Sequence, residues 1–223
     1  MTAASRRPVL VVAHRGASAR APENTLPALD WAVRLGADGV EVDVQRTADG
    51  VLVLVHDDDW QRTTGYAGSV AATPWECVRR LDAGSWFGVE HAGTAPPRLE
   101  KVLQAMPPHL LLNLELKSPG LHPGLGSAVV QALRGHPHRV LLTSFDWDCI
   151  EALLPTAGGI ELGLLSVAPL QRESAVRTRS LAWAGILGQP EIVPAVHARG
   201  FPYPLRQGQL SELLRPRERD EFR

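Results

Sequence analysis

Two short segments with the same alternation of side chains constrain the fold more than any other feature of this sequence. Residues 39–45 read GVEVDVQ, and residues 110–117 read LLLNLELK. Side chains two positions apart in a β-strand share a face, so each segment predicts one aliphatic face and one polar face. The polar faces carry Glu41 and Asp43 in the first segment and Glu115 in the second. An exposed edge strand would show the same alternation, but its recurrence favours two strands that direct carboxylates into a pocket.

Strands and helices alternate along most of the chain. Aliphatic runs predict strands at 9–13, 39–45, 51–55, 110–117, 139–145 and 160–166, and helical patterns cover 26–36, 98–106, 124–135 and 148–157. Repeated units of this kind form a parallel sheet covered by helices, either doubly wound or closed as a (β/α)8 TIM-type barrel. Polar residues at the ends of the first four strands favour the barrel, because several barrel strands bring their catalytic groups to one rim.

We expect a single barrel domain over residues 1–223. Residues 57–97 are rich in Asp, Gly, Thr and Trp and lack a clear period, which predicts a small insertion after strand three with one short helix near 74–82. Residues 201–223 form an atypical tail, in which Pro202 and Pro204 disfavour a central strand. The barrel is therefore expected to be incomplete or altered at its C-terminal strands.

The composition and net charge limit the classes of molecule that we expect this chain to bind. The chain is 44% hydrophobic and 21% charged, with a net charge of −1 and no basic stripe, so neither nucleic acid nor an anionic membrane surface is expected to bind. No segment approaches the ~20 apolar residues of a membrane span, and the N-terminus lacks the apolar run of a secretory signal. Cys77 and Cys149 are interpreted as free thiols, so we expect a cytoplasmic protein. Its oligomeric state stays open.

The acidic residues of the two alternating segments suggest a metal site. A single acidic residue on a strand has a simple explanation, since it can face water. Several charges gathered at one end of a barrel are different, because burying them without a counter-ion costs several kcal/mol each. Glu41, Asp43 and Glu115 supply hard oxygen ligands for one divalent cation, Mg²⁺ or Ca²⁺, with positions left for phosphate oxygens.

The basic residues at the same strand ends suit attack on a phosphodiester. Arg15 can form a forked contact with a phosphate, and Lys117 adds positive charge where negative charge builds up in the transition state. His14 and His56 can act as general acid and general base near neutral pH, in an order that the sequence leaves open. Asp57, next to His56, is a candidate for orienting an imidazole.

The ordered motifs carry a family resemblance. HRG at 14–16, APENTLPAL at 21–29, GVEVDVQRTADGVLVLVHD at 39–57 and NLELK at 113–117 follow one another along the chain. In this combination the chain resembles the glycerophosphodiester phosphodiesterase family, from about residue 8 to about residue 165. The resemblance implies a (β/α)8 barrel with a small insertion after strand three.

The resemblance also implies a set of site residues and a reaction. It implies a divalent metal on Glu41, Asp43 and Glu115, acid–base catalysis by His14 and His56, and phosphate contacts from Arg15 and Lys117. The implied substrate is a small-molecule glycerophosphodiester, such as glycerophosphocholine, which is hydrolysed to an alcohol and glycerol 3-phosphate. Glu23, within the PENT segment, lies close enough in sequence to support the site.

Two alternatives stay open at this level. A related lipid-directed phospholipase would share the two-histidine plan, although the three carboxylates argue against it. An inactive, truncated family member would keep the motifs but lose a stable site through its altered tail. The remaining histidines are interpreted as structural or solvent-facing, and they are His91, His109, His122, His136, His138 and His197.

Overall fold

The structure, a computed structural model, describes residues 10–166 and 183–186. These residues form a seven-stranded sheet in the order β1-β2-β4-β5-β6-β7, with β3 paired to β2 off this path. Neighbouring strands along the path are parallel, whereas β3 is antiparallel to β2. The strands are β1 Val12–His14, β2 Gly39–Arg46, β3 Leu52–Leu54, β4 Leu111–Leu116, β5 Arg139–Ser144, β6 Glu161–Ser166 and β7 Trp183–Ile186.

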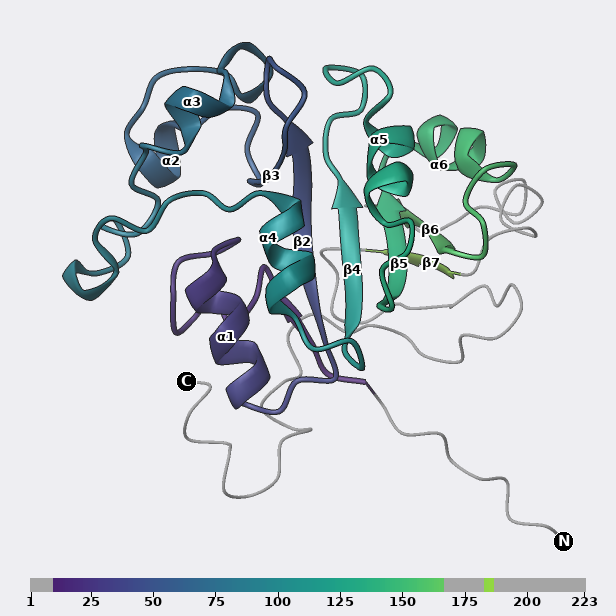
Figure 1. Cartoon of the computed structure of the whole chain (residues 1–223), viewed down its shortest axis with the longest axis horizontal. Coiled ribbons are helices and arrows are strands. Elements are labelled where there is room, and N and C mark those ends of the chain that lie inside the picture. The colour runs from purple at the N-terminus through teal and green to yellow at the C-terminus, as the bar shows by residue number, and fades with distance from the viewer. Residues whose placement is uncertain (1–9, 167–182, 187–223) are drawn as a thin grey trace, which may run out of the picture.

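Helices precede each parallel strand from β2 to β6, as the alternation of the sequence predicts. In Figure 1, α1 and α4 lie to the left of β2, and α5 and α6 lie to the right of β4. Helices α2 and α3 lie at the end toward which β2 and β4 point. The helices are α1 Leu26–Arg34, α2 Gln61–Thr64, α3 Trp75–Val78, α4 Leu99–Ala105, α5 Leu125–Ala132 and α6 Trp147–Leu153, with 3-10 turns η1 Val70–Ala72 and η2 Val89–His91. Helix α2 and strand β7 are elements that the sequence patterns did not predict.

The aliphatic faces of the two alternating strands form the centre of the core. The valines of β2 are fully buried, and so are the leucines of β4 that pack beside them. Helices α1, α4 and α5 supply the covering side chains, including Leu29, Val102 and Val129. Because one face of each strand is packed in this way, the alternating side chains between these residues must point to the other face. The core therefore fixes the direction of the carboxylates.

Helix α1 begins and ends where its sequence signals place it. The Thr25 side chain accepts a hydrogen bond from the Ala28 N–H at the first turn, and Pro27 lies within that turn, where a missing N–H costs nothing. Gly36 follows the helix with a φ of 77°, a conformation that glycine adopts without strain. These local signals set the position of the loop that precedes α1, which contributes to the site described below.

Strand β3 differs from expectation in its direction. Residues 51–55 were expected to form the third parallel strand, but Leu54 pairs antiparallel with Val44, and β4 is the parallel neighbour of β2. The reason is the length of the connection, because five residues, 47–51, allow a hairpin and not the crossover that a parallel pair needs. Because β3 runs back along β2, the chain approaches Asp43 just before His56. The Val55 N–H donates to the Asp43 carbonyl oxygen at 3.1 Å.

The segment between β3 and α4 has a small apolar cluster of its own. Trp60, Val70 and Val78 are fully buried there and pack against Val53 and Val55 at the end of the β2–β3 hairpin. The assignment of residues 57–97 as an insertion in a single domain stays a prediction. The expectation of an atypical tail at 201–223 concerns residues outside those that the structure describes.

Candidate active site

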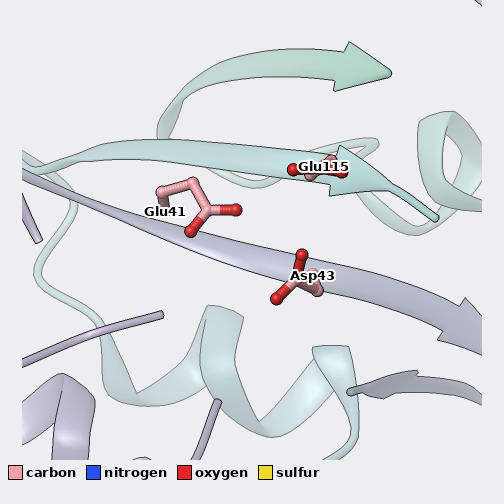
Figure 2. A group of neighbouring side chains, drawn as sticks. All are labelled: Glu41, Asp43 and Glu115. Carbon is pink, nitrogen blue, oxygen red and sulfur yellow. The ribbon is translucent and has the colours of Figure 1, made fainter. Parts of the chain in front are cut away.

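Three carboxylates meet between β2 and β4. Asp43 is the register partner of Glu115 across the two parallel strands, and Glu41 precedes Asp43 by two positions on the same face. Figure 2 shows Glu41 and Asp43 on β2 and Glu115 on the neighbouring strand β4. One carboxylate oxygen of each residue lies within 4.8 Å of the others, and all three residues are buried. The two alternating segments thus converge on one point.

Within the described part of the chain, two oxygens of the buried carboxylates are left without a hydrogen-bond partner. Among the described residues, Glu41 Oε1 and Asp43 Oδ1 are buried without a hydrogen-bond partner. Burial, followed by the negative charges of Asp43 and Glu115, raises the pKa of Glu41 well above its ordinary value. Burial and the charge of Asp43 also raise the pKa of Glu115. Unpaired oxygens on a compact set of acidic groups are a donor set that suits a hard divalent cation.

Asn24 holds Asp43 from the loop before α1. Its Nδ2 donates to Asp43 Oδ2 at 2.7 Å, and the Asp43 N–H donates to Asn24 Oδ1 at 3.1 Å. The φ of Asn24 is 57°, a left-handed conformation that asparagine tolerates better than most residues. Thr25, the next residue, is the N-cap of α1. Asn24 is thus a site residue that sequence reasoning missed.

The turn after β1 brings a histidine and an arginine to the carboxylates. Arg15 and Gly16 both have positive φ, 56° and 78°, and a Cβ on Gly16 would lie 2.8 Å from the Ala28 carbonyl carbon. This close approach requires glycine. The turn lets the Arg15 N–H donate to Glu41 Oε2 at 3.0 Å and places His14 Nε2 3.8 Å from the same oxygen. Burial, followed by the charge of Arg15, lowers the pKa of His14.

Two cationic side chains flank the carboxylates from opposite strands. Arg15 Nε lies 3.4 Å from Asp43 Oδ2, beside β1. Lys117 follows β4, and its Nζ lies 2.9 Å from Glu115 Oε1 and 3.8 Å from Asp43 Oδ1. Both residues that the sequence assigned to phosphate binding therefore lie beside the candidate metal site.

His56 and Asp57 form a close pair after β3. His56 Nδ1 lies 2.7 Å from Asp57 Oδ1. Burial acts to raise the pKa of Asp57, but hydrogen bonds from Arg62 and His56 outweigh it and lower the pKa to about 2. Asp57 is therefore ionised near neutral pH and accepts the hydrogen bond, so His56 Nδ1 is the donor and Nε2 is left for contacts within the site. The candidate role of Asp57 as an orienting group has a direct geometric basis.

Gln45 fixes the backbone that carries His56. Its Nε2 donates to the carbonyl oxygens of Val55, His56 and Asp57, at 3.1, 3.3 and 2.7 Å. Its Oε1 lies 3.0 Å from Nε2 of His122, which therefore donates. His122 was interpreted as structural or solvent-facing, and it is buried with a structural contact next to the site. His109 and His136 are exposed, whereas His197 lies outside the described residues.

The acidic, basic and imidazole side chains gather at the carboxyl ends of the strands of a parallel α/β sheet. This is the arrangement of a TIM-barrel active site. None of the helices in the described part of the chain has the length and apolar character that a membrane crossing requires. The chain belongs to the glycerophosphoryl diester phosphodiesterase family, whose sequence model matches residues 14–202. The match extends beyond residue 165, where the motif resemblance ends.

Relatives of known name share the same family. The chain is 39% identical over 160 residues to a glycerophosphodiester phosphodiesterase of Caldanaerobacter subterraneus, covering 70% of this chain and 66% of that protein. It is 33% identical over 201 residues to one of Bacillus altitudinis, covering 84% of this chain and 81% of that protein. For three of the relatives, the matched part spans 66%, 51% and 54% of their own length, about half to two thirds.

Solved structures agree with the fold. An Oleispira antarctica phosphodiesterase in complex with the product sn-glycerol-3-phosphate has a TM-score of 0.74 and 34% identity, covering 79% of this chain and 74% of that one. A glycerophosphodiester phosphodiesterase from Agrobacterium tumefaciens has a TM-score of 0.68 and 30% identity, covering 80% and 76%. The predicted fold class, a (β/α)8 TIM-type barrel, is confirmed by these neighbours. The expected alteration of its last strands concerns residues that the structure does not describe.

Proposed function

We propose that this chain hydrolyses small-molecule glycerophosphodiesters to an alcohol and glycerol 3-phosphate. The observation that carries the proposal is the buried cluster of Glu41, Asp43 and Glu115, whose ligand oxygens lie within 4.8 Å of one another and between two cationic side chains. The names of the relatives support the reaction, and the product complex of the Oleispira enzyme supports the choice of product.

The carboxylate cluster is proposed to hold one divalent cation, Mg²⁺ or Ca²⁺. Glu41 Oε1 and Asp43 Oδ1 are buried oxygens without a hydrogen-bond partner among the described residues, and an all-oxygen donor set fits either ion. When bound, the cation would polarise a phosphate oxygen and offset the charge that develops on it. Asn24 would keep Asp43 in place, since it occupies Asp43 Oδ2 and leaves Oδ1 for the ion.

The proton transfers are assigned to the two imidazoles. One takes a proton from the attacking oxygen, and the other delivers a proton to the alcohol oxygen as its bond to phosphorus breaks. The lowered pKa of His14, caused mainly by burial, keeps its imidazole neutral at pH 7, as an accepting group must be. His56 keeps Nε2 available for the reaction because Asp57 occupies its Nδ1.

The phosphate contacts are assigned to Arg15 and Lys117. The Arg15 guanidinium is held beside Asp43 and is suited to forked hydrogen bonds with two phosphate oxygens. Lys117 approaches from the opposite strand and supplies a compact positive charge. A phosphodiester placed between them would face the carboxylates as well as both imidazoles.

The direct test is hydrolysis of glycerophosphocholine with Mg²⁺ or Ca²⁺. We expect release of glycerol 3-phosphate that a chelator abolishes and that His14→Ala reduces by at least about 100-fold. His109→Ala is the matched control, because His109 is exposed on the loop before β4. A wild-type chain that stays inactive with both ions would favour the inactive family member instead.

The proposal also places the enzyme in the cytoplasm. Cys77 and Cys149, the two cysteines of the chain, are both free thiols, as expected in a reducing compartment. Cell fractionation followed by detection of the chain tests this location. Recovery from the extracellular or periplasmic fraction would contradict it.

A further inference from the structure

Arg62, on α2, lies between two carboxylates that belong to different parts of the site. Its Nε donates to Asp57 Oδ2 at 2.6 Å, and its Nη1 donates to Glu23 Oε2 at 2.9 Å. Its Nη2 donates to both residues, at 2.7 Å to Glu23 Oε1 and 3.2 Å to Asp57 Oδ1. All three nitrogens of the guanidinium are therefore used, in a pair of forks that only a planar arginine side chain can make.

Each of these carboxylates also binds a residue of the reaction centre. Asp57 Oδ1 lies 2.7 Å from His56 Nδ1. Glu23 Oε1 accepts a hydrogen bond from Arg15 Nη1 at 2.9 Å. The charges alternate along the series Asp57, Arg62, Glu23 and Arg15, and His56 is hydrogen-bonded at its Asp57 end. A proton-transfer group and a phosphate-binding group are thus joined through one side chain from the segment between β3 and α4.

The contacts of Arg62 are better suited to fixing positions than to adding stability. Its side chain is 44% exposed, and ion pairs at such sites contribute little to the free energy of unfolding. Arg79 offers a comparison within the same segment, because it forms a similar fork with Glu76, at 2.7 and 2.6 Å, on the exposed helix α3. Among the described residues, the other hydrogen-bond partner of Glu76 is Arg80, which is not a residue of the reaction centre.

We propose that Arg62 is a positioning residue for phosphodiester hydrolysis, acting through Asp57 on the imidazole of His56 and through Glu23 on the guanidinium of Arg15. The inference rests on the proposed function. Without Arg62, the carboxylates of Asp57 and Glu23 are free to rotate. Asp57 then no longer orients His56 for proton transfer, and Glu23 no longer orients Arg15 for phosphate binding. Both kcat and KM for a glycerophosphodiester should therefore change.

The kinetic test uses glycerophosphocholine and Mg²⁺ with the full chain. Arg62→Ala should lower kcat/KM by about 10- to 100-fold, with a lower kcat and a higher KM, while Arg79→Ala stays at the wild-type value. Arg62→Lys keeps the charge but cannot fork onto two carboxylates, so its kcat/KM should stay close to that of Arg62→Ala. Equal losses in Arg62→Ala and Arg79→Ala, or full activity in Arg62→Lys, would overturn the proposal.

Chemical rescue separates positioning from folding. Because the Arg62 side chain is partly exposed, guanidinium ions at non-denaturing concentration can enter the space that Arg62→Ala opens. They should restore activity several-fold in this variant, whereas methylammonium, which cannot fork, should not. If Arg62→Ala does not fold, Arg62→Lys carries the same kinetic comparison. Rescue by both ions to the same extent would contradict the geometric argument.

A spectroscopic readout distinguishes failure of this inference from failure of the proposed function. The His56 Nδ1 proton, bound to Asp57, should give a downfield imidazole resonance in the proton NMR spectrum, identified by its loss in Asp57→Asn. Arg62→Ala should broaden this resonance, whereas Arg79→Ala should leave it unchanged. The measurement needs no substrate. An unchanged resonance in Arg62→Ala would refute the positioning role, even in a chain that is fully active.

Discussion

Neutralising one of the three clustered carboxylates should stabilise the metal-free protein while removing its response to metal. The change is Glu41→Gln, which preserves the shape of the side chain and its capacity to accept the hydrogen bond from the Arg15 N–H. Stability and metal binding should therefore change in opposite directions.

The size of the effect follows from the distances within the cluster. Two unit charges 4.8 Å apart repel by about 3.5 kcal/mol at an effective dielectric constant of ~20, and Glu41 makes two such pairs. The nearby Arg15 charge and partial protonation of the cluster offset much of this repulsion. We therefore expect a gain of about 2 kcal/mol in the free energy of unfolding without metal, or about 4–8 °C in melting temperature.

Thermal unfolding in a chelator and in excess Mg²⁺ or Ca²⁺ measures both effects. In the wild type, a cation at about 100 times its dissociation constant should add about 2.7 kcal/mol, whereas Glu41→Gln should gain little. Glu100→Gln, on the exposed side of α4, is the control and should behave like the wild type. The reasoning fails if Glu41→Gln melts below the wild type in chelator or keeps the full response to metal.

Three further predictions concern pH and packing. The raised pKa values of Glu41 and Glu115 favour the metal-free fold below their ordinary value of 4.5, and this contribution is lost as pH rises through the raised values. The stability advantage of Glu41→Gln in chelator should therefore grow with pH. Metal affinity should increase over the same range, and calorimetry at several pH values can measure both effects. Burial, followed by the Arg46 charge, lowers the pKa of His122, so this imidazole binds a proton more readily in the unfolded chain than in the folded one. The free energy of unfolding should therefore fall as pH drops below 6.5. His122→Gln should reduce that fall, as urea denaturation can measure. Leu114→Ala should lower the free energy of unfolding by about 2–5 kcal/mol in the same assay, because Leu114 on β4 is fully buried in the core. Leu121→Ala should change it little, because Leu121 is exposed.

The positions of the three carboxylates could be predicted because they depend on short-range geometry. The two-residue period of a strand places Glu41 and Asp43 on one face without any knowledge of the rest of the chain. The contact with Glu115 needed a further condition, because β4 lies beside β2 only since β3 turns back as an antiparallel hairpin. The burial of the intervening valines and leucines then leaves a single direction for the acidic groups.

Other parts of the site depend on contacts between segments far apart in the sequence. His122 meets Gln45 across 77 positions, and Arg62 meets Glu23 across 39, and no local pattern announces either pair. Asn24 was missed for a different reason, because asparagine just before a helix is typical of an N-cap, whereas here Thr25 caps α1 and Asn24 binds Asp43. The antiparallel direction of β3 could have been predicted from the sequence, because the turn around Gly50 is too short for the crossover that joins parallel strands.

The return of β3 along β2 has a consequence for how this sequence can change in evolution. One contiguous stretch, residues 39–57, carries Glu41, Asp43 and Gln45 together with His56 and its partner Asp57. Recombination that exchanges this hairpin between related genes would transfer two of the three clustered carboxylates and the proposed acid–base histidine together. The recipient would contribute Glu115, so a chimera could gain a working centre from only two fragments.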